Sequence, residues 1–270
     1  MSIAELVEDR VVEAIYAVKT KRKLRTRSGS SYLALELVDP TGSIEARVWN
    51  DVELLDGRFS EGDAIRVLGR VEKFRDRLQL DVRSIEAAED VDPASLTPRT
   101  RRDPNEAAGF LEFLVAEITH PGLSATVQSV LGDRDLAAYP AADDHHSYAG
   151  GLMEHTVGVA TLCRETAQLH PRLRPDLVLA AALVHDVGRT LELGPGPAFA
   201  QTDEGRLLGH VHLGLRLIEA RAEGLAAAQL AELLHCVSVH HDARGARTAE
   251  AAVLYHANQL DAIAATRRVD

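Results

Sequence analysis

All twelve histidines of the chain lie at or after position 120, and four of them recur at intervals that suit a metal site. His155, His185, His210 and His240 are separated by 30, 25 and 30 residues, and Asp186 directly follows His185. Each interval is about one helix plus its connection. Imidazoles with a carboxylate suit Mn²⁺, Fe²⁺, Mg²⁺ or Zn²⁺ at a hydrolytic centre, where a carboxylate can bridge two ions. The spacing therefore predicts that successive helices bring these five side chains to one metal centre.

The pair His185–Asp186 contributes most to this prediction. It follows the apolar run "LVLAAALV" at 177–184, where the sequence predicts a helix interior. An unpaired aspartate is costly to bury there, and metal coordination relieves that cost. A single histidine on a core-facing helix is more often a hydrogen-bonded structural residue. Five ligand-type residues together favour the metal site.

Two different sequence patterns divide the chain. The first 90 residues contain no histidine and all four lysines. There, "SYLALELVDPTGSIEARVW" alternates apolar and polar residues around a tight-turn sequence, and "DAIRVLGRVEKFRDRLQLDVRSIEA" reverses at FRDR. Four or five strands of a small barrel or sandwich are predicted.

A polar stretch with prolines at 93, 98 and 104 follows and predicts a linker, because neither helix nor strand tolerates it well. Beyond it the apolar residues take a helical period. The predicted helical segments are 106–119, 151–170, 176–189, 209–222, 225–241 and 248–268. We expect an all-β domain at 1–90, a linker at 91–106 and an all-α domain at 107–270.

Composition excludes several classes of protein. Cys163 and Cys236 lack C-x-x-C spacing, which indicates buried free thiols in a reducing compartment rather than a zinc finger. The N-terminus lacks a signal-peptide core, and the longest apolar run is too short to span a bilayer. We expect a soluble cytoplasmic protein without membrane partners. The net charge of −11 means that only a local basic patch can bind polyanions.

Such a patch lies in the first domain, in "VKTKRKLRTR". Its six basic residues are Lys19, Lys21, Arg22, Lys23, Arg25 and Arg27. Tyr32, Trp49 and Phe74 lie in or beside the strands that follow. A basic groove with stacking rings holds single-stranded nucleic acid. The alternative is that Trp49 and Phe74 are core residues and the basic run is an exposed edge strand protected by charge.

Four short motifs resemble, in this order, those of the HD-domain metal-dependent phosphohydrolases. They are "EHT" at 154–156, "HDVG" at 185–188, "GH" at 209–210 and "HH" at 240–241. More narrowly, "HHSYAGGLMEHT", "LVHDVGR", "EGRLLGH" and the β-rich front domain are similar to the YhaM-type 3′-to-5′ exoribonucleases, over nearly the whole chain. The resemblance implies an N-terminal OB-fold barrel that binds single strands, then an all-α HD domain whose metals activate water against a phosphodiester.

The resemblance also implies roles for individual residues. It makes His155 a metal ligand, with Gly150 and Gly151 turning the backbone tightly into its helix. His145 and His146 then lie near the mouth of the site, for which a solvated loop is the alternative. With His241 they complete the predicted substrate-binding set.

Two positions depart from the family pattern. Arg189 stands where the family usually has lysine after HD-x-G, and it keeps a cation suited to phosphate. With Asp186 it forms the predicted catalytic pair. Asn258 stands where the HD pattern places its last metal-binding aspartate, and an amide is a weaker ligand. Asp261, three positions on and nearly on the same helix face, is a candidate ligand directly or through water, with a surface carboxylate as the alternative.

The resemblance therefore implies a metal-dependent 3′-to-5′ exoribonuclease acting on single-stranded RNA or DNA and releasing nucleoside 5′-monophosphates. One or two divalent ions are expected, with Mn²⁺ first and Fe²⁺, Mg²⁺ and Zn²⁺ as alternatives. Two other functions remain open: a hydrolase of small nucleotides or cyclic dinucleotides, and a non-catalytic RNA-binding protein with a degenerate HD site. The sequence leaves open the metal, the choice of RNA or DNA, and whether the chain forms a homo-oligomer.

Overall fold

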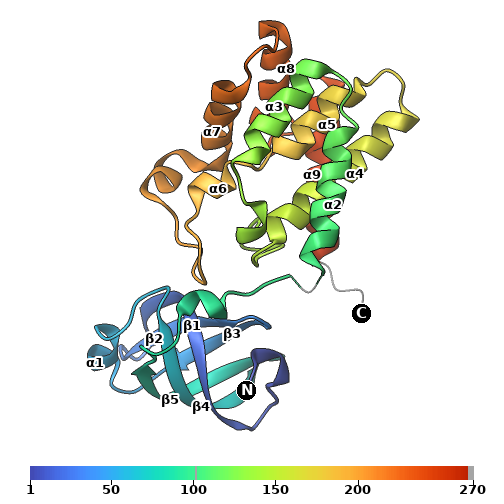
Figure 1. Ribbon diagram of the computed structural model, residues 1–270. Helices are drawn as coiled ribbons and strands as arrows, with labels where there is room; N and C mark the ends of the chain where they lie inside the picture. The colour runs from blue at the N-terminus through green and yellow to red at the C-terminus, as the bar shows by residue number, and fades with distance from the viewer. Residues whose placement is uncertain (101, 267–270) are drawn as a thin grey trace. The chain divides into compact units, whose positions relative to one another are not determined.

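The computed structural model describes residues 1–100 and 102–266, and it divides the chain into two compact units (Figure 1). Met1–Arg99 with Pro195–Ala200 form the first unit, and Thr100–Gly194 with Gln201–Asp270 form the second. The predicted limits of domains and linker remain predictions. The helix α2 begins at Pro104, inside the predicted linker, and residues 101 and 267–270 lie outside the described residues.

The first unit is a closed barrel of five strands in the order β1-β2-β3-β5-β4. Its strands are β1 (Val11–Arg25), β2 (Ser31–Asp39), β3 (Gly42–Val48), β4 (Ala64–Phe74) and β5 (Arg77–Ala87). Its helices are the 3₁₀ helix η1 (Ile3–Glu5), α1 (Val52–Asp56) and the 3₁₀ helix η2 (Pro93–Leu96). Strands β3 and β5 pair in parallel and the other neighbours pair antiparallel. The predicted small barrel is confirmed.

Local turn chemistry explains both predicted reversals. Between β2 and β3, the carboxylate of Asp39 accepts hydrogen bonds from the backbone N–H and the hydroxyl of Thr41. Between β4 and β5, Arg75 and Asp76 have φ values of 50° and 64°, as a two-residue hairpin turn requires. Alternate residues of β2, among them Leu33, Leu35 and Leu37, point into the apolar core of the barrel.

The second unit is all-α (Figure 1). Its helices are α2 (Pro104–Ala116), α3 (Pro121–Gly132), the 3₁₀ helix η3 (Leu136–Ala138), α4 (Gly151–Leu169), α5 (Pro175–Val184), α6 (Arg189–Glu192), α7 (Asp203–Arg221), α8 (Ala227–Ser238) and α9 (Ala249–Thr266). Every predicted helical segment contains a helix. Helix α3 was not predicted. Its sequence does contain helix signals, with Pro121 at the first position and Leu123, Val127 and Val130 along one buried face.

Helix α5 lies at the centre of this unit. It contacts α2, α3, α4, α8 and α9, and all eight residues of its run 177–184 are buried. This complete burial explains the uninterrupted apolar sequence. The prediction that His185 and Asp186 lie in a helix interior is wrong, because α5 ends at Val184 and residues 185–188 form the turn before α6. The buried helix thus delivers both side chains to the middle of the unit.

Among the described residues, no helix combines the length and hydropathy needed to span a membrane.

Candidate metal centre and nucleic-acid interface

The start of α4 places His155 by way of two glycines. Gly150 is the N-cap of the helix with a φ of 92°, a conformation that favours glycine. A Cβ atom on Gly151 would lie 2.0 Å from the carbonyl oxygen of His146. The segment before the helix therefore packs directly against its first turn, and His155, one turn further on, is fully buried.

Close backbone packing also places His210 near Asp186. A Cβ atom on Gly188 would lie 1.9 Å from the carbonyl oxygen of His210, so the turn after α5 touches the backbone of α7. Helix α7 is kinked at Gly209, whose φ of 70° and ψ of 161° are not helical. The kink lies immediately before His210 and sets the direction in which its ring leaves the helix.

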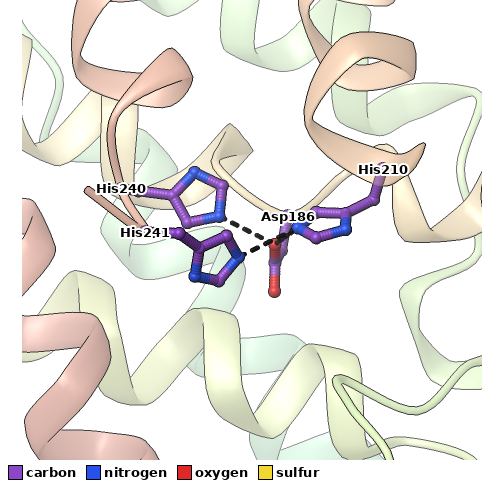
Figure 2. A group of neighbouring side chains, drawn as sticks. All are labelled: Asp186, His210, His240 and His241. Carbon is purple, nitrogen blue, oxygen red and sulfur yellow. Dashed lines mark hydrogen bonds and ion pairs between the residues drawn. The ribbon is translucent and has the colours of Figure 1, made fainter. Parts of the chain in front are cut away.

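Asp186 is the centre of the site, as Figure 2 shows. Its Oδ1 atom lies 3.2 Å from Nε2 of His210 and 3.3 Å from Nε2 of His240. His241 lies beside them, with its Nε2 atom 3.1 Å from that of His210. A turn, the kinked helix α7 and the segment after α8 thus contribute four possible metal-binding side chains to one place.

The other carboxylate oxygen of Asp186 faces a second group. Its Oδ2 atom lies 3.9 Å from Nε2 of His155 and 3.8 Å from Nε2 of His185. These two nitrogens are 3.3 Å apart, and Oδ1 of Asn258 is 3.0 Å from Nε2 of His155. Asp186 therefore joins two clusters of ligand atoms, one on each carboxylate oxygen.

Contacts at the opposite ring nitrogens determine which atoms carry protons. Nδ1 of His185 donates to the carbonyl of Ala182 at 2.7 Å, and Nδ1 of His240 donates to that of Val237 at 2.6 Å. A neutral imidazole has one proton, so both Nε2 atoms present lone pairs to the centre. Nδ1 of His155 is likewise 2.7 Å from the carboxylate of Asp261.

Asn258 completes this arrangement, since its amide nitrogen donates to the carbonyl of His240 at 3.2 Å and its oxygen therefore faces Nε2 of His155. With its proton on Nδ1, His155 presents Nε2 as an acceptor to two further acceptors, Oδ1 of Asn258 at 3.0 Å and Nε2 of His185 at 3.3 Å. Ligand atoms about 2.1 Å from one cation stand roughly 3 Å apart when they subtend a right angle. The spacing of these atoms fits a divalent cation.

Two buried polar atoms of the centre have no hydrogen-bond partner among the described residues. Among the described residues, Oδ1 of Asp186 and Nε2 of His240 are buried and make no hydrogen bond. Such atoms are costly to bury, and a cation between them removes the cost. The donor set of imidazoles, carboxylate and amide is one that Mn²⁺, Fe²⁺ and Zn²⁺ accept.

The charges of the centre also suit a cation. Burial lowers the pKa of His185 to about 3, so the imidazole is neutral at pH 7. Burial alone would raise the pKa of Asp186, but the close contact with His210 helps to hold it well below its ordinary value. Burial likewise opposes protonation of His210, yet Asp186 and Glu192 raise its pKa. A metal at this nitrogen competes with a proton.

Arg189 lies at the edge of the centre, held by a carboxylate that the sequence analysis did not single out. Its Nη1 atom donates to Glu192 at 2.8 Å, and its Nε atom lies 3.9 Å from Oδ2 of Asp186. Glu192 also lies 3.4 Å from Nδ1 of His210. No sequence motif marks Glu192, because its role depends on α6 and α7 packing side by side.

The segment before α4 brings two further predicted residues near His155. The ring centroid of His145 lies 5.1 Å from that of His155, and His145 pairs with Asp144. Nε2 of His146 is 3.0 Å from Asp261. Both histidines are half-buried, and their place at the mouth of the site remains a prediction.

Asp261 lies on the other side of His155 from Asp186. Its carboxylate contacts Nδ1 of His155, whereas the other predicted metal-binding residues face Nε2 of that ring or Asp186. The structure thus brings Asp261 next to the centre without placing it among the atoms around Asp186.

The basic run of the barrel separates into two groups. Lys19 pairs with Glu36 at 3.2 Å, and Lys23 pairs with Glu53. Lys21 donates to the carbonyl of Phe59 at 2.6 Å. The three arginines of the run, Arg22, Arg25 and Arg27, are exposed and form no ion pair with any described residue. The arginines are therefore the cations that remain available to a ligand.

Aromatic rings lie exposed on the barrel surface. Trp49 is 48% exposed and stacks on Tyr32 with ring centroids 4.7 Å apart. Tyr32 pairs in register with Leu24 of β1, so an apolar patch crosses two strands. Phe74 is 56% exposed at the β4–β5 turn, with Arg75 over its ring. Trp49 and Phe74 thus do not belong to the barrel core.

Comparison with known proteins agrees with both halves of this description. The model of the OB-fold nucleic acid binding domain matches residues 16–88, and the model of the HD domain matches residues 152–263. The chain thus contains an OB-fold domain followed by an HD domain. The HD match includes every predicted metal-binding residue, and an HD domain implies dependence on a divalent metal.

One relative resembles the OB-fold and HD-domain chain along nearly its whole length. The 3′-5′ exoribonuclease YhaM of Geobacillus sp. (strain WCH70) is 28% identical over 265 residues, which cover 93% of this chain and 82% of that protein.

Solved structures similar to the OB domain include the second OB-fold domain of replication protein A from Methanococcus maripaludis, with 26% identity, a TM-score of 0.28, and coverage of 33% of this chain and 94% of that one. The protein PriB from Ralstonia solanacearum has 13% identity, a TM-score of 0.27, and coverage of 29% and 97%.

Proposed function

We propose that this chain is a metal-dependent 3′-to-5′ exoribonuclease that acts on single-stranded RNA and releases nucleoside 5′-monophosphates. The observation that supports it most is the centre around Asp186, where, among the described residues, Oδ1 of Asp186 and Nε2 of His240 are buried 3.3 Å apart without a hydrogen bond. A chain that aligns with an exoribonuclease over 93% of its length carries this centre.

We assign two groups of metal ligands that share Asp186. One group consists of His155, His185, Asn258 and the Oδ2 atom of Asp186, and the other consists of His210, His240 and its Oδ1 atom. His241, predicted from the sequence to bind substrate, lies beside the second group and is a further candidate ligand. One or two ions fill these positions, with Mn²⁺ first and Fe²⁺, Mg²⁺ or Zn²⁺ as alternatives. A cation held there would generate a nucleophile from water at neutral pH and would offset charge on phosphoryl oxygens.

The surrounding residues hold the centre ready for this chemistry. Carbonyls of α5 and α8 keep the protons of His185 and His240 on Nδ1, which orients both rings before a substrate arrives. Glu192 holds Arg189 at the edge of the site, where its positive charge stabilises a phosphoryl group as charge develops. His145 and His146 are assigned to the mouth of the site as substrate contacts.

In the OB domain, Arg22, Arg25 and Arg27 contact phosphates while Tyr32 and Trp49 stack on bases. Free cations beside exposed rings support this assignment, since stacking tolerates any base and phosphate contacts carry no sequence information. Contacts from Lys19, Lys21, Lys23 and Phe74 remain predictions.

The proposed substrate is RNA, with DNA as the second choice. A cytoplasmic location suits the two buried free thiols. Homo-oligomerisation stays open.

The test is hydrolysis of a single-stranded RNA with a label at its 5′ end. We expect the labelled RNA to shorten one nucleotide at a time with Mn²⁺ present, nucleoside 5′-monophosphates to accumulate, and the reaction to stop in EDTA. The variant Asp186→Asn serves as the inactive control. Intact RNA together with cleavage of a cyclic dinucleotide would indicate the small-nucleotide hydrolase instead. Intact RNA without metal binding would indicate a non-catalytic RNA-binding protein.

A further inference from the structure

His155 is held through both of its ring nitrogens, which point to opposite sides of the imidazole. Nδ1 lies 2.7 Å from Oδ2 of Asp261, and Nε2 lies 3.0 Å from Oδ1 of Asn258 and 3.3 Å from Nε2 of His185. An ionised carboxylate only accepts hydrogen bonds, so Nδ1 carries the proton of the neutral ring. The lone pair of Nε2 then faces the centre around Asp186.

A missing side chain on α4 makes room for this carboxylate. A Cβ atom on Gly158 would lie 2.2 Å from Oδ1 of Asp261. Residue 158 stands one turn after His155 on the same helix, so the glycine opens the surface beside the ring that Asp261 contacts. Any larger residue at this position displaces the carboxylate from His155.

A second histidine holds the same carboxylate from the side of the opening segment. Nε2 of His146 lies 3.0 Å from Oδ2 of Asp261, and Nδ1 of His146 lies 3.1 Å from the hydroxyl of Tyr148. That hydroxyl donates to Glu154 at 2.9 Å. The position of Asp261 is therefore determined by α4, α9 and residues 146–148 together.

We infer that Asp261 is a positioning residue that keeps the proton of His155 on Nδ1 and turns Nε2 toward Asp186, without itself binding the metal; the inference rests on the proposed function. Asn258 presents a neutral amide oxygen to this group, so Asp261 supplies negative charge from behind the imidazole. A carboxylate on the far nitrogen of a ligating histidine fixes the tautomer of the ring and raises its basicity. Gly158 serves the same purpose by leaving space.

The experiment compares metal binding by the parent chain, Asp261→Ala, Asp261→Asn and Gly158→Ala, using calorimetric titration with Zn²⁺. We expect Asp261→Ala to weaken binding of the ion at His155 by roughly 10- to 100-fold while the number of bound ions stays the same. Asp261→Asn keeps an acceptor for Nδ1–H and should lose less. Gly158→Ala retains the carboxylate but displaces it, and should also weaken binding. Gly109→Ala in α2 is the matched control, since its Cβ meets no atom within 4 Å.

The ¹⁵N chemical shifts of His155 provide a readout that a purely structural role would not change. In the Zn²⁺-loaded parent we expect a proton on Nδ1 and the metal on Nε2, with the Nδ1 signal altered in Asp261→Ala. Unchanged affinity together with unchanged shifts in Asp261→Ala would overturn the inference. A second result would also overturn it: Asp261→Ala binds one ion fewer per chain, and Nδ1 of His155 carries no proton in the parent. Asp261 and His146 would then bind a cation of their own. Failure of the proposed function is seen separately, as intact RNA in the presence of metal-loaded parent chain.

Discussion

The candidate functional residues are exposed in the barrel unit and buried in the helical unit. In the barrel, the core is apolar and the residues proposed to bind RNA lie outside it, with Trp49 exposed and Arg22 free of ion pairs among the described residues. In the helical unit, His155, His185 and Asp186 are buried in its middle. Binding and stability are therefore separable in the barrel, whereas in the helical unit the same side chains affect both.

The difference follows from what each kind of chemistry needs. Stacking and phosphate contact work at a solvated surface, because bases and phosphates must reach the protein from water. A metal centre needs ligands held in fixed directions, and burial supplies this by packing each ring and pairing its second nitrogen. Burial also makes each ligand atom costly when its partner is absent.

The largest effect is expected from removing a buried ligand. His185→Ala should reduce hydrolysis of RNA by on the order of 10³-fold or more, because a ligand to the proposed metal is lost from the catalytic centre. The rate is measured at saturating Mn²⁺, with circular dichroism to confirm that the chain folds. His212→Ala, which removes an exposed histidine of α7, should retain the parent rate. A His185→Ala variant as active as the parent would show that the centre has been misassigned.

A smaller effect is expected on the barrel surface, and only on binding. Trp49→Ala should weaken binding of a single-stranded RNA by about 5- to 150-fold, corresponding to the ~1–3 kcal/mol of one stacked base. Fluorescence anisotropy in EDTA measures binding without hydrolysis, and the thermal unfolding temperature should not change. Phe110→Ala removes an aromatic ring of similar exposure from α2 and is the control. Equal dissociation constants for the parent and Trp49→Ala would show that the ring of Trp49 does not contact the RNA.

The smallest effect concerns a buried carboxylate away from the metal centre. The backbone N–H and the guanidinium of Arg174 donate to the carboxylate of Glu250, which ties the start of α5 to α9. Burial alone would raise the pKa of Glu250, but hydrogen bonds from Arg174 hold it below its ordinary value of 4.5. Glu250→Gln should lower the free energy of unfolding at pH 7 by about 1–2 kcal/mol, a modest loss because Arg174 remains partly solvated.

The pH dependence of this effect has a definite sign. A carboxyl group whose pKa is lowered by folding stabilises the native state fully above its ordinary pKa, and the contribution is lost as pH falls through the lowered value. The difference between parent and Glu250→Gln in urea unfolding should therefore shrink between pH 7 and pH 3. Glu219→Gln, at an exposed position of α7, should show no such difference at either pH. A difference in the free energy of unfolding between the parent and Glu250→Gln that grows as the pH falls would contradict the role given to Glu250.

Much of the fold was predictable because its signals are local. Alternation in 31–49 and the two turn sequences predict barrel strands, and the apolar run at 177–184 predicts a buried helix. The boundary at Val184 was not predictable, because the periodicity of the run does not reveal that the backbone turns there. The turn depends on Gly188 packing against the backbone of α7, a contact between residues far apart in the chain.

The sequence by itself determined which residue types meet at the centre. Histidines at intervals of one helix, with Asp186 after a buried run, are enough to predict a metal-binding group. Tertiary structure alone decided which atom of each residue faces which neighbour. Glu192 behind Arg189, and Asp261 on Nδ1 of His155 rather than on Nε2, follow from how α6, α7, α4 and α9 pack. Spacing along a chain specifies a helix face to within a turn, whereas the choice between two ring nitrogens about 2 Å apart depends on packing at the scale of single atoms.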